Sequence, residues 1–220
     1  MTRSTAPAAL RIDFVSDVSC PWCAIGLKSL EQAIGRVADS VEVDLHFQPF
    51  ELNPQMPPQG QDIAEHLQQK YGSTPGQLAA NREAIRARGA ALGFTFNQRD
   101  RIYNTFDAHR LLHWAALESG ERELALKQAL LRAYFTEGLD ISAHANLVRI
   151  AAEAGLEGNR AQAILDSGEY AEEVRTQEQR YLDAGIHAVP AVIINDRHLI
   201  SGGQAPEVFE NALRQIAAAG

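Results

Sequence analysis

The sequence predicts an α/β protein whose mixed β-sheet is built from both ends of the chain and interrupted by a long all-helical insertion. Residues 1–60 show a strand, helix and strand pattern, and residues 168–220 show helix, strand, strand and helix. The residues between them, 61–167, carry helical periodicity almost throughout. We therefore expect one discontinuous sheet unit, residues 1–60 with 168–220, and one helical insertion, residues 61–167.

The N-terminal part of the sheet unit is expected to hold two strands around one helix. Leu10, Ile12 and Phe14 alternate with charged residues, as in a short strand. An apolar repeat predicts a helix over about residues 22–37. Apolar and polar residues then alternate over 41–48, which predicts a second strand with one buried face, and a proline-rich stretch follows.

The insertion is expected to consist of helices separated by glycines. Glycine is frequent just after a helix because it readily adopts the left-handed backbone conformation that ends one. Such glycines stand near the joints between the periodic segments. The predicted helices span residues 62–71, 77–92, 104–119, 121–137, 144–154 and 159–165.

The C-terminal part is expected to return to mixed structure. Pro190 opens its first strand, where a missing N–H costs the sheet little. The peptide bond before Pro190 could be cis, because that form costs only about 0.5–1 kcal/mol before proline. The predicted elements are a helix over 170–184, strands over 191–194 and 198–201, and a helix over 206–218. Together with the N-terminal part, this order is that of the thioredoxin fold with a helical insertion.

The two cysteines of the chain, Cys20 and Cys23, form the motif Cys-Pro-Trp-Cys at the junction of the first strand and helix. Asp17 and Ser19 offer caps, and Pro21 falls in the first turn, where proline is tolerated. A thiol at a helix N-terminus loses its proton more easily, because the helix dipole favours negative charge there. The spacing also lets the two thiols close a disulfide with little chain to order.

Composition limits the function classes. The formal net charge is −8, which argues against a nucleic-acid-binding protein, because such a protein needs a basic face. No apolar run approaches the roughly 18–20 residues that span a bilayer. Residues 1–10 do not resemble a secretory signal as written, so we expect a cytoplasmic protein. In that compartment a lone Cys-x-x-Cys pair is more often catalytic or metal-binding than structural.

Six segments carry a resemblance that covers roughly Ile12 to the end of the chain. They are Ser16–Gly26, Pro49–Pro54, Asn104–Leu111, Ala133–Gly138, Val189–Pro190 and Ile200–Gln204. As a set, they are similar to the DsbA-like thiol–disulfide oxidoreductases and, more narrowly, to the cytoplasmic subgroup called FrnE-like. Ala24 stands where the family often has tyrosine, and Ala188 where glycine often precedes the Val-Pro pair. Both departures could change how a substrate fits.

Thiol–disulfide exchange is the function we expect, with Cys20 as the nucleophile and Cys23 as the resolving thiol. We expect no cofactor and no metal. The expected partner is a protein or small molecule that carries a thiol or a disulfide, glutathione among the candidates, and a homodimer is left open. Supporting residues are expected at Pro21, Trp22, Val189 and Pro190, and cleft residues at Phe50, Asn53, Asn104, Phe106, His109 and Arg110.

The sequence allows three other interpretations. A zinc site could add His109 and His113 to the cysteines, but the roughly 85 residues between them exceed the spacing typical of zinc fingers. A kappa-class glutathione transferase or 2-hydroxychromene-2-carboxylate isomerase resembles this layout, but such enzymes commonly carry serine where Cys20 stands. A chaperone-like module would hold unfolded chains on the helical insertion. The direction of electron flow, as oxidase, reductase or isomerase, is left open.

Overall fold

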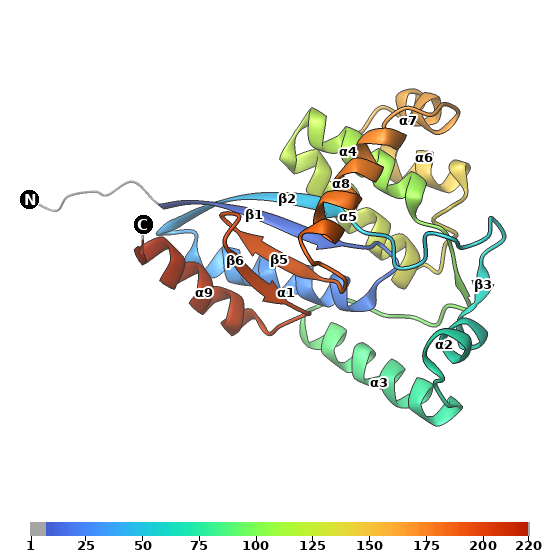
Figure 1. Ribbon diagram of the computed structural model, residues 1–220, viewed down its shortest axis with the longest axis horizontal. Helices are drawn as coiled ribbons and strands as arrows, with labels where there is room; N and C mark the ends of the chain where they lie inside the picture. The colour runs from blue at the N-terminus through green and yellow to red at the C-terminus, as the bar shows by residue number, and fades with distance from the viewer. Residues whose placement is uncertain (1–7, 220) are drawn as a thin grey trace, which may run out of the picture.

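A four-stranded mixed sheet, in the order β2-β1-β5-β6, forms the centre of the computed structural model, which describes residues 8–219 (Figure 1). The strands are β1 (Ala8–Ser16), β2 (Val41–Pro49), β5 (Ala191–Ile194) and β6 (His198–Ser201). β1 pairs in parallel with β2 and antiparallel with β5, which pairs antiparallel with β6. The register places Phe14 beside Phe47 on one side and Val192 on the other.

Helices cover both faces of this sheet. α1 (Pro21–Val37) and α9 (Pro206–Ala219) pack together along one face, and α8 (Ala171–Asp183) lies over the other (Figure 1). Phe14 faces the α1 side, whereas the next residue, Val15, packs with α8 through Tyr181. Because successive strand residues point to opposite faces, a strand covered on both sides has apolar residues in both registers.

Strand β2 shows the alternation predicted for residues 41–48, but its apolar residues are buried to different extents. Val41 and Phe47 are buried, and Val43 and Leu45 are half-buried. The polar positions between them are exposed or half-buried. β2 is the edge strand next to the insertion, and its Phe47 packs edge-on against Phe14.

The insertion contains the predicted helices and one feature that the sequence did not reveal. Two-residue strands β3 (Gln61–Asp62) and β4 (Arg101–Ile102) pair antiparallel at its base. Strands this short show no alternation, so no pattern could predict them. The helices are α2 (Ile63–Tyr71), α3 (Pro75–Ala91), α4 (Phe106–Glu118), α5 (Gly120–Phe135), α6 (His144–Glu153) and α7 (Gly158–Leu165).

This arrangement is a thioredoxin-like fold with a helical insertion, as predicted. The division of the chain at residues 60 and 168 stays a prediction, because one buried core runs from the sheet into the insertion. The expectation about a leader in residues 1–10 falls mostly on residues 1–7, which lie outside the described range. None of the helices within residues 8–219 is both long and apolar enough to cross a membrane.

Candidate active site at the start of α1

Cys20 is the N-cap residue of α1, and Pro21 follows it in the first turn. The Cys20 N–H donates to the Asp17 carbonyl at 3.2 Å, and the Cys20 carbonyl accepts from the Cys23 N–H at 3.1 Å. Both thiols are free. Both residues are buried, but Cys20 keeps 4% of its surface exposed whereas Cys23 keeps 0%, so Cys20 lies nearer to solvent.

The second thiol is held in its protonated form. Burial raises the pKa of Cys23 well above its usual value, and the neighbouring Cys20 raises it further. The charge of Lys127 opposes this effect without reversing it. Cys23 is therefore suited to act second, after a partner has reacted with Cys20.

A cis peptide bond joins Val189 to Pro190, as the sequence suggested. The Cys20 thiol lies 3.8 Å from the Val189 carbonyl oxygen, to which it donates. Gly26 permits the close approach of α1, because a Cβ there would lie 3.0 Å from the Pro190 ring. The Cys-Pro-Trp-Cys motif and the Val189–Pro190 pair, far apart in sequence, are thus in contact.

Asp17 organises the loop in front of Cys20. This fully buried carboxylate accepts the Ser19 N–H at 3.1 Å and the Leu52 N–H at 2.7 Å, and it lies 3.7 Å from His109 Nε2. Burial alone would raise the pKa of Asp17, but His109 and the two N–H donors together lower it. The sequence indicated only a capping role, whereas Asp17 connects the dithiol loop, the loop after β2 and α4.

Trp22, between the two cysteines, forms one wall of the site. The guanidinium group of Arg88 on α3 lies 5.4 Å from the centre of its ring. Arg88 also donates to the Gly203 carbonyl at 2.9 Å. A Cβ at Gly203 would lie 2.8 Å from the Trp22 carbonyl oxygen, so only glycine fits here without a shift. Neither Arg88 nor Gly203 was predicted as a site residue.

Two predicted cleft residues lie on the loop after β2. Phe50 is buried in a small cluster with Ala191, and Val189 packs against that cluster. Asn53 is half-buried and accepts from Lys70 Nζ at 2.8 Å. Asn53 and Lys70 line an open pocket of about 390 Å³ beside this loop.

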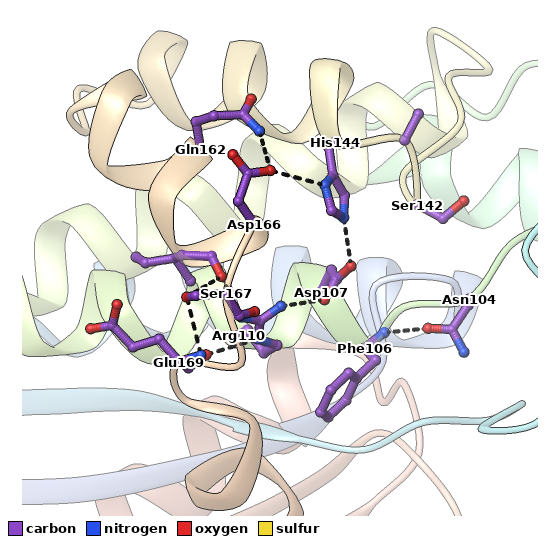
Figure 2. Close-up of polar contacts among 12 residues, drawn as sticks. Asn104, Phe106, Asp107, Arg110, Ser142, His144, Gln162, Asp166, Ser167 and Glu169 are labelled. Atoms are coloured by element: carbon purple, nitrogen blue, oxygen red, sulfur yellow. Dashed lines mark hydrogen bonds and ion pairs between the residues drawn. The ribbon is translucent and has the colours of Figure 1, made fainter.

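Phe106 is the first residue of α4, and Asn104 lies two residues before it (Figure 2). The Asn104 side chain accepts the Phe106 N–H at 2.9 Å, and Thr105 is the N-cap residue. The guanidinium group of Arg175 lies 3.8 Å from the centre of the Phe106 ring. These contacts give Phe106 a covered face beneath α8.

Arg110, predicted as a cleft residue, directs its donors at the segment after α7 and at its own helix. Its guanidinium group pairs with Asp107 at 2.7 Å and donates to the carbonyl oxygens of Glu169 at 2.8 Å and Ser167 at 2.6 Å (Figure 2). Asp107 in turn contacts His144 at 3.0 Å. Arg110 is therefore committed to joining α4 to the segment after α7, and it has no donor directed at the dithiol. The sequence placed it on the correct helix but could not show which carbonyl groups it would meet.

His109 lines a cavity of about 190 Å³ among β2, α4 and α5. His113 lines the same cavity, as does half-buried His46. The two histidines of α4 thus share a cavity wall. Within residues 8–219, no group of three or more His, Cys, Asp or Glu side chains could hold a metal ion.

Two buried charged residues of α5 line this cavity and were not predicted. Lys127 is fully buried, its ammonium group has no hydrogen-bond partner among the described residues, and it lies 5.6 Å from the Phe47 ring centre. Glu123 is 1% exposed and accepts the Phe47 N–H at 3.1 Å. Burial lowers the pKa of Lys127, although Cys23 and Asp17 oppose this. Burial raises the pKa of Glu123 to about 7.

Stability is expected to depend on pH through Glu123. Its folded-state pKa of about 7 lies above the usual 4.5, so the folded state keeps a proton that the unfolded chain releases. The free energy of unfolding should therefore decrease as pH rises from about 4.5 to about 7, by up to about 3 kcal/mol. Urea unfolding at a series of pH values measures this. Glu123→Gln should flatten that part of the profile, and an unchanged slope in this variant would contradict the assignment.

The comparisons with known proteins agree with this geometry. The family model described as a DSBA-like thioredoxin domain matches residues 11–214. The uncharacterized protein YwbO of Bacillus subtilis (strain 168) is 29% identical over 206 residues, which cover 93% of this chain and 96% of YwbO.

Two solved structures are similar over nearly the whole chain. The probable DsbA oxidoreductase SCO1869 from Streptomyces coelicolor has a TM-score of 0.88 and 33% identity, over 96% of this chain and 90% of that one. A candidate protein disulfide isomerase from Nitrosomonas europaea has a TM-score of 0.70 and 20% identity, over 96% of this chain and 97% of that one, a likeness of fold alone. Since the family model and SCO1869 both span almost all of the chain, it belongs to the family of DSBA-like thioredoxin domains.

Proposed function

We propose that this protein exchanges disulfides through the Cys20–Cys23 pair. One observation carries the proposal: Cys20 is the N-cap residue of α1, and its thiol lies 3.8 Å from the carbonyl oxygen of Val189, next to the cis proline. The second thiol lies one helical turn further on, without exposed surface. A thiol at a helix N-terminus, followed one turn later by a more deeply buried thiol, suits sequential attack in disulfide exchange.

The reaction proceeds in two displacements. Cys20 attacks a substrate disulfide as the thiolate, forms a mixed disulfide with one substrate sulfur and expels the other as a thiolate. Cys23 then loses its proton and attacks the Cys20 sulfur, which releases the second substrate thiolate and closes the Cys20–Cys23 disulfide. Two electrons pass from the dithiol to the substrate. The reverse sequence oxidises a substrate dithiol, and the reduction potential decides the direction.

The partner we propose carries a thiol or disulfide on an extended peptide or a small molecule such as glutathione. An extended segment would pair with the backbone at Val189, as in β-strand addition. We propose a cytoplasmic location and the FrnE-like subgroup on the sequence features given above. No prosthetic group is required, because the sulfur atoms themselves carry the electrons.

Replacement of Cys23 by serine is expected to trap mixed disulfides. Cys20 can still complete the first displacement, but the second lacks its nucleophile. Incubation with a disulfide-bearing peptide, followed by non-reducing mass spectrometry, should show a covalent adduct at Cys20 that dithiothreitol releases. The double variant Cys20→Ser/Cys23→Ser should form none. Absence of an adduct in the single variant would refute the assigned roles.

A further inference from the structure

Helix α3 reaches the active site through a narrow contact. Along its 17 residues, only Ile85 and Gly89 are buried. Arg88 comes three residues after Ile85, so the two residues are neighbours on the helix surface. Its contacts with Trp22 and Gly203 are therefore part of the contact between the insertion and the dithiol region.

The charge of Arg88 is not neutralised by a carboxylate. Within residues 8–219, no Asp or Glu oxygen lies within ion-pair distance of Arg88, whereas Arg86 on the same helix pairs with Glu83 at 2.7 Å. The Gly203 carbonyl that Arg88 contacts is neutral. Arg88 is also exposed. The Arg88 side chain thus holds an unpaired positive charge over the ring of Trp22, the residue that separates the two cysteines in sequence. The chain as a whole has a formal net charge of −8.

Three other charged groups near the dithiol are either buried or paired. Asp17 is fully buried and satisfied by two N–H donors. Lys127 is fully buried beneath the site. Lys28, further along α1, is paired with Glu31 at 2.7 Å. Arg88 therefore determines the sign of the charge that an approaching substrate meets beside Trp22.

We propose that Arg88 is a specificity-determining residue that favours disulfides carrying carboxylate groups close to the sulfur atoms. The proposal rests on disulfide exchange at Cys20 and adds the substrate class. The interaction of two unit charges about 6 Å apart in water changes a binding equilibrium by about threefold. Arg88 would favour an anionic substrate by that factor and disfavour a cationic one by the same factor, so it should change the ratio of their rates by about tenfold. Arginine suits this role because its guanidinium group stacks on an aromatic ring while its edge binds carboxylates.

The test uses three small disulfides that differ in charge: dithiodipropionate with two carboxylates, hydroxyethyl disulfide with none, and cystamine with two ammonium groups. Stopped-flow Trp22 fluorescence and thiol alkylation give the rate at which each oxidises the reduced protein. In that reaction the substrate disulfide is reduced to two thiols while the protein dithiol is oxidised to the Cys20–Cys23 disulfide. The variants are Arg88→Gln, Arg88→Lys and, as a matched charge control on the same helix, Arg86→Gln.

The ratio of the dithiodipropionate rate to the cystamine rate is the decisive quantity. It should fall about tenfold in Arg88→Gln at low salt, stay largely intact in Arg88→Lys and Arg86→Gln, and shrink in the wild type at high salt. An unchanged ratio in Arg88→Gln, or an equal loss of rate for all three disulfides, would overturn the proposal, because a purely structural role affects every substrate alike. If the wild type reacts with none of the three, disulfide exchange itself fails instead.

Discussion

Replacement of Cys20 by serine is expected to lower the rate of disulfide exchange by more than about a thousandfold, because serine supplies no thiolate at neutral pH. Cys20 caps α1 through its backbone, and no side-chain capping bond is present, so the fold should tolerate the change. Reduction of a fluorescent peptide disulfide, with glutathione as the electron donor, measures the rate.

A matched variant separates chemistry from structure in that experiment. Gln32→Ser changes an exposed side chain of the same helix and leaves both thiols in place. It should keep most of the activity, whereas Cys20→Ser should lose it at an unchanged unfolding midpoint. A Cys20→Ser protein that still turns over the peptide at the wild-type rate would contradict the assignment of the nucleophile.

Replacement of Asp17 by alanine is expected to have the largest effect on stability, a loss of about 2–4 kcal/mol in the free energy of unfolding. The change leaves the N–H groups of Ser19 and Leu52 without their acceptor in a buried place. Each unpaired buried group costs about 1–3 kcal/mol. Urea unfolding measures the loss, and Asp17→Asn, which keeps one carbonyl oxygen, should lose less.

The same residue is expected to make the protein sensitive to acid. Because the pKa of Asp17 is lower in the folded state, its contribution to stability is present above the usual pKa of 3.8 and is lost as pH falls below that value. Asp17→Ala should remove this part of the acid dependence. A variant within about 0.5 kcal/mol of the wild type at neutral pH would show that Asp17 does not hold the loop.

The sequence was sufficient to predict the order of the helices and of the four strands in the thioredoxin-like sheet, though not the short strands β3 and β4. Alternation in β1 and β2 and helical periodicity in the insertion are strong local patterns, and the pairing of elements from the two chain ends followed from them. The position of Cys20 at a strand-to-helix junction and the cis bond before Pro190 were also predicted and are confirmed. The catalytic roles of the cysteines stay predictions.

The sequence could not show what the insertion brings to the site. Arg88, Glu123 and Lys127 occupy ordinary helical positions, and local sequence does not reveal that α3 meets Trp22 or that α5 buries two charges. Arg110 is a second example of what local sequence does not reveal. The resemblance predicted it as a cleft residue, and tertiary packing directs its side chain to backbone carbonyl groups. Such contacts depend on how helices far apart in sequence pack.

The central claim is that Cys20 and Cys23 form one reversible redox couple, and a titration in glutathione buffers tests it most directly. The protein is equilibrated over a range of reduced-to-oxidised glutathione ratios, quenched with an alkylating reagent and weighed by mass spectrometry. We predict a single two-electron transition, with a tenfold change in the disulfide-to-dithiol ratio per about 30 mV, accompanied by a change in Trp22 fluorescence. Two thiols that stay reduced at every ratio, or that are modified independently of each other, would contradict the account.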